Sequence, residues 1–487
     1  MTTVTLSLIS HTNVGKTTLA RTLLRREIGE VRDQPHVTTI AEAHPLIETD
    51  DARLLLWDTP GFGDTVRLMK RLRHERDPIG WFLHQVWDRL RNRSLWCSQE
   101  AVRNVRDEAD VVLYLVNATE DPETAGYLGH ELELLAWMNR PVLVVLNQVG
   151  PDGARRGMER WRSHLASFPV VRGVLALDAF SRAWVEETLV LERVVSLLEG
   201  DKRTAMVGLL RAWNDRNLGV FDASIEAIAQ YLAGIAVDRE PIASPAGPGA
   251  SWIRERLADL QALSRVGRER AMGALFDRVQ AATRRLMDRL IELHQLSGAS
   301  KAQVERRVED ADVQGNDAIN PTTGAIAGGA VSGLLTGLGA DVASGGLSLG
   351  GGAILGAILG ALGGAAFGGA YKLATGGESG IQFQPAAMDR LAREALLRYL
   401  VVAHHGRGLG DYLDVDYPAH WTADVDALLT QHGDALRSVW LDAARDGRGS
   451  AAAVAERLRV LLRAALTDLL RRRFPEAAVL GEDRGGY

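Results

Sequence analysis

The stretch 10–17, which reads Ser-His-Thr-Asn-Val-Gly-Lys-Thr, constrains the fold of this chain more than any other segment. An apolar run at 4–9 precedes it, and a helical pattern at 18–24 follows it. A Gly-Lys-Thr sequence between a strand and a helix is typical of a phosphate-binding loop, in which backbone N–H groups and the helix N-terminus surround the phosphate oxygens. The sequence therefore predicts an α/β unit with a phosphate site at its first strand–helix junction.

Individual side chains of this loop have expected roles. Lys16 is expected to reach the β- and γ-phosphates of a nucleotide, and the Thr17 hydroxyl to bind Mg²⁺. Ser10 stands where such loops usually begin with glycine, and serine is less suited than glycine to a left-handed backbone conformation. We expect the nucleotide to contact the whole loop, which comprises Ser10, His11, Thr12, Asn13, Val14, Gly15, Lys16, Thr17 and Thr18.

A second predicted strand, at 52–57, ends in the sequence Asp-Thr-Pro-Gly-Phe at 58–62. An aspartate at this end of a strand can bind Mg²⁺ through water, and the Gly61 amide can sense the γ-phosphate. Phe62 occupies the place where many nucleotide hydrolases have a glutamine that orients the attacking water. Because phenylalanine cannot orient water, we expect hydrolysis to be slow or to need a group from elsewhere.

Length and composition limit the other possibilities. A chain of 487 residues exceeds a single core and predicts two or three domains. The net charge of −6 argues against a general nucleic-acid binder. The single cysteine, Cys97, excludes an intramolecular disulfide and favours a reduced, cytoplasmic setting. The N-terminus runs directly into a predicted strand without a secretion signal.

These motifs resemble those of the translation-factor-class GTPases, most closely the Era-like group. The loop at 10–17, the Thr-Thr pair at 38–39 and the sequence at 58–62 carry the resemblance, and predicted strands at 111–117 and 141–147 fit the family's order. Over residues 1–200 the resemblance implies a P-loop GTPase domain, with a mostly parallel sheet and helices on both faces.

The same resemblance implies an activity and assigns residues to it. It implies that the domain binds GTP or GDP with Mg²⁺ and hydrolyses GTP, with Lys16, Thr39 and Gly61 acting at the γ-phosphate. Either Thr38 or Thr39, of which we favour Thr39, would close over the metal that Thr17 and Asp58 hold.

The base-reading motif departs from the family pattern. The family has Asn-Lys-x-Asp, whereas this chain has Asn-Gln-Val-Gly at 147–150. The family's aspartate accepts two hydrogen bonds from guanine, and Gly150 has no side chain to do so. The resemblance leaves Asn147 and Gln148 as base contacts, with Asp178 and Ala179 in the last base-contacting loop. Guanine is implied by the resemblance, and an NTPase without guanine specificity is the alternative.

Extra length at 64–106 is rich in arginine and tryptophan. Val66, Met69 and Leu72 recur in it at helical spacing beside basic residues. Two interpretations remain open. The insert is either an amphipathic helical pair packed on the protein, with its arginines in solvent, or a surface that reports the nucleotide state to a partner or an anionic membrane.

The remainder of the chain is predicted to be helical. Helices are expected at 205–213, 225–233, 252–287, 387–404, 422–444 and 451–474, with a linker at 240–249. The predicted plan is a GTPase domain at 1–200, a helical region at 201–319, a Gly-rich apolar hairpin at 320–377 and a C-terminal helical region at 378–487. This arrangement resembles a bacterial GTPase family whose C-terminal half is a domain of unknown function.

The apolar hairpin allows three interpretations. Between residues 320 and 371 the only charge is Asp341, and glycine recurs at every fourth position. As a helix, residues 323–340 would span roughly 27 Å, near the thickness of a bilayer core. A membrane hairpin with a glycine face explains the pattern. A buried glycine zipper in a helical domain and a flexible linker are the alternatives.

Two classes of function follow from the sequence. The first is a GTP-hydrolysing switch, cytoplasmic and attached to or inserted in the inner membrane through residues 320–377. The second is a nucleotide-binding scaffold or oligomerising protein with little turnover, which Ser10, Phe62 and the altered base-reading motif favour. A homo-oligomer or a partner protein is compatible with both classes.

Overall fold

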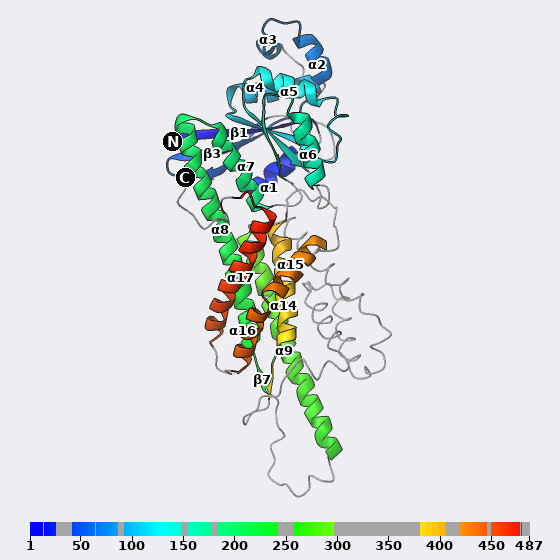
Figure 1. The fold of residues 1–487 in the computed structure, drawn as a ribbon, viewed down its shortest axis with the longest axis vertical. Coiled ribbons are helices and arrows are strands. Elements are labelled where there is room, and N and C mark those ends of the chain that lie inside the picture. Colours follow the sequence, from blue (N-terminus) through cyan, green and yellow to red (C-terminus); the bar gives the residue numbers. More distant parts are fainter. Residues whose placement is uncertain are drawn as a thin grey trace. The chain divides into compact units, whose positions relative to one another are not determined.

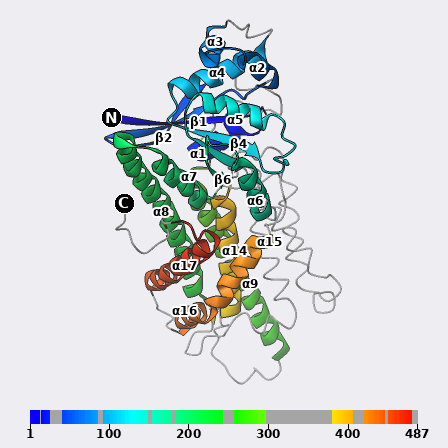
Figure 2. The ribbon, with the colours of Figure 1, turned by 45° about the horizontal axis from the view of Figure 1, so that its top comes forward.

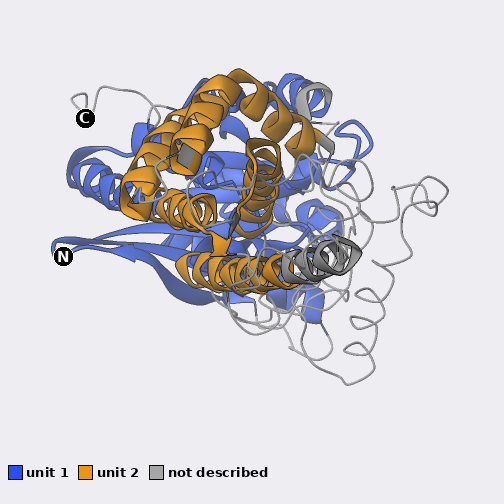
Figure 3. Cartoon of the chain, turned by 90° about the horizontal axis from the view of Figure 1, so that it is seen from below, with its two compact units in different colours: residues 1–219, 403–412, 471–487 blue, residues 220–402, 413–470 orange. Residues whose placement is uncertain are grey.

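The computed structural model describes residues 1–12, 14–25, 41–63, 65–85, 92–147, 154–177, 183–241, 257–296, 380–405, 419–445, 450–477 and 479. The chain divides into two compact units (Figure 3). Unit 1 comprises residues 1–219, 403–412 and 471–487, and unit 2 comprises residues 220–402 and 413–470.

A six-stranded sheet forms the centre of unit 1, in the order β2-β3-β1-β4-β5-β6. Every pair of neighbours is parallel except β2 and β3. The mostly parallel sheet predicted from the sequence is therefore confirmed. The strands are β1 (Thr2–Ser10), β2 (Glu42–Glu48), β3 (Ala52–Asp58), β4 (Val111–Asn117), β5 (Val142–Asn147) and β6 (Val171–Ala176).

The edge strand β2 was not predicted, because its sequence does not read as a strand. Pro45 interrupts it, and the pairing with β3 shifts register between Pro45 and Ile47. Proline lacks the N–H that a central strand must donate, so it is tolerated at an edge and at a bulge. The antiparallel pairing also allows β2 to join the sheet without a crossover helix.

Helices cover both faces of the sheet (Figures 1 and 2). One face packs against α1 (Lys16–Leu24), α7 (Trp184–Leu197) and the first turns of α8 (Gly200–Val237). The other packs against α4 (Arg93–Asp107), α5 (Leu128–Trp137) and α6 (Ala154–Leu165). Strand β4 contributes side chains to both faces of the sheet. Leu113 packs in the core beneath α1, α7 and α8, and Tyr114 packs in the core beneath α4, α5 and α6. Alternation along a buried strand divides its side chains between the two faces.

The insert forms three helices rather than the predicted pair: α2 (Thr65–Leu72), α3 (Pro78–His84) and α4. Pro78 at the first turn and the Asp77 side chain, which accepts a hydrogen bond from Gly80 N at 2.9 Å, begin α3. Met69 and Leu72 of α2 are buried, whereas Val66 is 39% exposed. The apolar side of α2 therefore packs on the protein, as the first of the two interpretations expected.

Helix α8 corrects the prediction of separate helices at 205–213 and 225–233. It is continuous from Gly200 to Val237. The polar residues between the two predicted segments are accommodated, since Asn217 accepts a hydrogen bond from Arg25 and Ser224 donates to Val220 O at 2.7 Å. Hydrogen bonds to a side chain and to the backbone of the helix thus reduce the cost of burying these polar groups.

Unit 2 is largely helical in its described part. Its helices beyond α8 are α9 (Leu257–Leu293), α14 (Pro385–Ala403), α15 (Ala419–Gln431), α16 (Gly433–Arg445) and most of α17 (Ala451–Arg473), and the short strands β7 (Glu240–Pro241) and β8 (Gly380–Ile381) pair.

Two helix predictions in this unit need correction. Helix α9 runs six residues beyond the predicted end at 287, because Leu290 and Ile291 continue its buried side. The single helix predicted at 422–444 is divided into α15 and α16, with the break just before Gly433. The predictions at 387–404 and 451–474 agree with α14 and α17.

The apolar hairpin predicted at 320–377 lies outside the described residues, as does the linker at 242–249. Among the residues that the structure describes, one helix is long and apolar enough to cross a membrane, namely α8. Half of its most apolar window is buried within the protein, and because a core helix can meet the same criteria, this helix is only weak evidence for a membrane span.

We expect the start of α8 to stabilise the sheet of unit 1. Leu209 is fully buried in the core that includes β1, β3 and β4. Leu209→Ala should lower the free energy of unfolding of this unit by about 2–5 kcal/mol, because it leaves a cavity. Val66→Ala, at an exposed position, should change it by less than about 0.5 kcal/mol. Hydrogen exchange of β4 and β5 amides measures both, and unchanged protection in Leu209→Ala would place α8 outside this core.

Candidate nucleotide-binding site

The predicted phosphate loop joins β1 to α1 at the carboxyl end of the parallel strands. Ser10 is the last residue of β1, and it has no left-handed conformation, so the strain expected for serine does not arise. Gly15, which caps α1, has φ +92°, a value that favours glycine. Lys16 and Thr17 then lie in the first turn of α1, where backbone N–H groups have no partner within the helix.

The Lys16 ammonium is held inside the loop. Its Nζ donates to Ser10 Oγ at 2.9 Å, and only 7% of the residue is exposed. Burial lowers the pKa of Lys16, and the negative charges of Asp58 and Glu131 oppose that shift. A phosphate group at this point would stabilise the charged ammonium in the same way.

Asp58 ends β3, beside β1 in the sheet, where Leu8 is its register partner. Thr17 Oγ1 donates to Asp58 Oδ2 at 2.7 Å, so two of the three predicted metal ligands are adjacent. Burial raises the pKa of Asp58, while the Thr17 hydrogen bond and the Lys16 charge act in the opposite direction. Asp58 Oδ1 is buried and has no hydrogen-bond partner among the residues that the structure describes.

The Thr17 hydroxyl oxygen and the Asp58 carboxylate fit a hard divalent cation. Mg²⁺ takes oxygen ligands and is commonly bound through one or two protein groups together with phosphate oxygens. A buried carboxylate oxygen without a partner is costly, and a cation or its bound water would remove that cost. Thr17 and Asp58 are the described residues that would hold Mg²⁺.

Gly61 approaches the loop closely, as its predicted role requires. A Cβ at this position would lie 3.0 Å from Lys16 Nζ and 3.2 Å from Thr12 Cα. The side chain of Phe62 points the other way, into the core, and is fully buried. Phe62 N donates to Ser10 O at 2.9 Å, so this segment is attached to the end of β1.

Asn147 ends β5 and is fully buried against the loop. Its Nδ2 donates to Val14 O at 2.9 Å. The amide therefore anchors the phosphate loop, in addition to the base contact that the sequence predicts for it. Of the other predicted site residues, Asn13, Thr39, Gln148, Asp178 and Ala179 lie outside the described residues, so their roles stay predictions.

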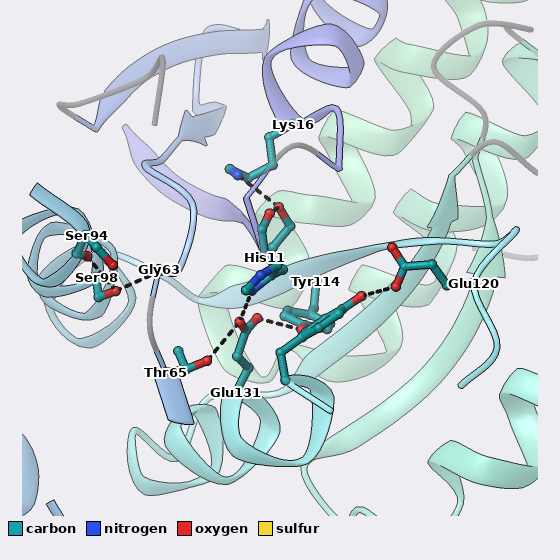
Figure 4. A network of polar contacts seen from close by, with 11 residues as sticks. His11, Lys16, Gly63, Thr65, Ser94, Ser98, Tyr114, Glu120 and Glu131 are labelled. Atoms are coloured by element: carbon teal, nitrogen blue, oxygen red, sulfur yellow. Dashed lines mark hydrogen bonds and ion pairs between the residues drawn. The ribbon is translucent and has the colours of Figure 1, made fainter. Parts of the chain in front are cut away.

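Sequence reasoning missed one group beside the loop. Glu131 of α5 is fully buried, and it contacts His11 of the loop, Thr65 at the start of α2 and Tyr114 of β4 (Figure 4). The available signal was a glutamate within the apolar stripe of Leu128, Leu132 and Leu135, which recurs at helical spacing.

Two family models match this chain. Residues 5–148 match the model described as a 50S ribosome-binding GTPase. Residues 164–467 match the model described as a domain of unknown function, DUF3482.

Similar proteins are found for the N-terminal part. The GTPase Era of Geotalea uraniireducens is 27% identical over 194 residues, which are 40% of this chain and 54% of that protein. The GTPase Era of a Thermoanaerobacter species is 24% identical over 197 residues, which are 40% of this chain and 55% of that protein. This chain thus spans about half the length of the relatives it matches.

A solved structure of Era with MgGDPNP and a fragment of 16S ribosomal RNA has a TM-score of 0.31 and 20% identity. The match covers 41% of this chain and 59% of that one.

We expect Gly61→Ala to disturb the site. The added methyl would displace the Lys16 ammonium and press on the Thr12 backbone, and a misplaced group at a binding site costs roughly tenfold to a hundredfold. Titration with Mg²⁺ and a non-hydrolysable GTP analogue measures the loss. Gly126→Ala is the matched control, because a Cβ there meets nothing within 4 Å. Equal affinities in the two variants would contradict the close approach of Gly61.

Proposed function

This chain belongs to the family defined by the domain of unknown function DUF3482, which here follows an Era-like P-loop GTPase domain, and we propose that it is a GTP hydrolase acting as a nucleotide-dependent switch. The observation that carries the proposal is the arrangement of Lys16, Thr17, Asp58 and Gly61 around one point at the carboxyl edge of the sheet.

Each described side chain of the site has a task in this proposal. Lys16 stabilises the charge of the phosphate groups, and the first turn of α1 donates backbone N–H groups to them. Thr17 and Asp58 hold the cation in place, and the Gly61 amide meets the γ-phosphate. Mg²⁺, when bound, neutralises charge on the β- and γ-oxygens. Thr39 is proposed to join this set when GTP is present.

The proposed turnover is slow. Phe62 has no group that can orient water, and its side chain is buried in the core away from the loop. The group that orients the attacking water must therefore come from elsewhere than position 62, and hydrolysis without such a group is slow.

Guanine is the proposed base, with Asn147, Gln148, Asp178 and Ala179 as its contacts. Support comes from the likeness to the Era GTPases and from the place of Asn147 beside the loop. The glycine at position 150 weakens the preference, and an NTPase without base specificity is the alternative that the measurement below distinguishes.

We expect Mg²⁺ with GTP or GDP to raise the thermal stability of the full chain, whereas ATP and ADP should not. A ligand that binds only the folded state adds about 2.7 kcal/mol at one hundred times its Kd. Lys16→Ala should abolish the shift and reduce phosphate release from GTP by roughly 10²–10³-fold, and Lys70→Ala, an exposed lysine on α2, is the control. Equal increases in melting temperature with adenine nucleotides would indicate an NTPase without guanine specificity. An increase with guanine nucleotides that is not accompanied by phosphate release favours the nucleotide-binding scaffold. No increase with any nucleotide excludes both the switch and the scaffold.

Attachment to the cytoplasmic membrane through residues 320–377 is the second part of the proposal. Its support is the sequence, in which a charge-poor stretch carries a glycine at every fourth position. Full-length protein should float with vesicles of bacterial lipid composition in a density gradient, and a variant lacking residues 320–377 should not. A full-length chain that stays at the bottom of the gradient would favour a buried glycine zipper.

A further inference from the structure

The buried carboxylate of Glu131 connects the two chain segments that border the phosphate site. Its Oε1 accepts hydrogen bonds from His11 Nδ1 at 2.7 Å and from Thr65 Oγ1 at 3.2 Å, and its Oε2 accepts one from Tyr114 OH at 2.7 Å (Figure 4). A buried carboxylate is destabilising unless it is hydrogen-bonded or paired, and here all three donors come from other elements. The fold therefore keeps a costly group at this point and gives each of its two oxygens at least one hydrogen bond.

The first segment is the phosphate loop. His11 follows directly on Ser10, the acceptor of the Lys16 ammonium, so the orientation of His11 affects the start of the loop. The His11 ring is held on two sides, because it stacks on Tyr127 with centroids 4.3 Å apart and bonds to Glu131. Its backbone forms an isolated parallel bridge with Phe62.

The second segment follows Gly61. Thr65 begins α2, four positions after the glycine that approaches Lys16 and Thr12. Gly63, between them, donates its N–H to Ser98 Oγ of α4 at 3.0 Å (Figure 4). The Thr65–Glu131 bond fixes the far end of this segment to α5. The Glu131 carboxylate thus bonds to the phosphate loop and to the segment after Gly61, although Glu131 itself belongs to α5.

We propose that Glu131 is a positioning residue, which holds the phosphate loop through His11 and the segment after Gly61 through Thr65 in the arrangement that binds GTP. This inference rests on the proposed function, because it concerns the same nucleotide site. Its consequence is selective: loss of the tie to His11 weakens the binding of GDP and GTP, whereas loss of the tie to Thr65 weakens GTP alone, since that segment meets only the γ-phosphate.

The experiment compares affinities of the full chain for GDP and for a non-hydrolysable GTP analogue, each with Mg²⁺. Glu131→Gln keeps the volume but replaces one acceptor oxygen by a donor, and we expect GTP-analogue binding to weaken about tenfold and GDP binding less. Thr65→Val keeps the shape and removes one donor; it should weaken the GTP analogue severalfold and leave GDP unchanged. Glu159→Gln, the same change at an exposed position of α6, is the matched control and should match the wild type.

Two further variants separate positioning from a purely structural role. Tyr114→Phe removes a donor from β4, outside both segments, and should lower the melting temperature without changing the GDP-to-GTP affinity ratio. In His11→Gln combined with Thr65→Val, the loss of GTP-analogue affinity should be smaller than the product of the single losses, because both hydrogen bonds act through the same Glu131 carboxylate.

The outcomes are distinct for the two proposals. A wild-type chain that binds no guanine nucleotide overturns the proposed function, and the inference with it. A wild type that binds both nucleotides, with Thr65→Val unchanged in its affinity ratio, overturns the inference alone. The inference is also overturned if Glu131→Gln weakens the binding of GDP and of the GTP analogue equally, in proportion to its loss of melting temperature. Thr65→Val keeps the test valid if Glu131→Gln does not fold.

Discussion

The site depends on two buried side chains of opposite charge. Lys16 lies in the first turn of α1, and Asp58 lies at the end of β3. Both side chains are almost inaccessible to solvent. Burial lowers the pKa of Lys16 and raises the pKa of Asp58. Each charge partly offsets the cost of the other, as their mutual influence on the two pKa values indicates. A phosphate beside Lys16 and a cation beside Asp58 would complete the compensation. The parallel pairing of β1 and β3 places the two residues together, since the phosphate loop follows the carboxyl end of β1 and Asp58 is the last residue of the neighbouring strand β3.

Much of this arrangement could be predicted from the sequence, because it depends on local signals. Five of the six strands are apolar runs, and the Gly-Lys-Thr and Asp-Thr-Pro-Gly sequences mark the turns that follow β1 and β3. Strand β2 carried no such signal, since Pro45 and polar residues are compatible with an edge only once the partner strand is known. The continuity of α8 was also hidden, because Asn217 and Ser224 read as a break until their tertiary partners are seen.

Glu131 illustrates a different limit. Its place in an apolar stripe could be read from the sequence, but its three partners are separated from it by 17 to 120 positions. Helical periodicity identifies which side of α5 faces the core, and it contains no information on which donors that core presents. A charged residue at a core position is therefore a reason to look for a function, and the fold shows which partners that residue has.

The contacts of the segment after Asp58 limit how a γ-phosphate could act on it. Phe62 is buried in the core and its N–H bonds to Ser10, so a local shift of Gly61 would expose an aromatic side chain that is worth about 1.5–3 kcal/mol when buried. Gly63 and Thr65 are bonded to α4 and α5. Leu68 of α2, Phe82 of α3 and Val102 of α4 share one core, so these helices are packed together. Displacement of α2–α4 as a body would keep the contacts among these helices but would break those that the same core makes with β4 through Tyr114. The segment after Asp58 is therefore held by hydrogen bonds to the sheet and to the insert, on whose surface Lys70 and Arg71 are exposed.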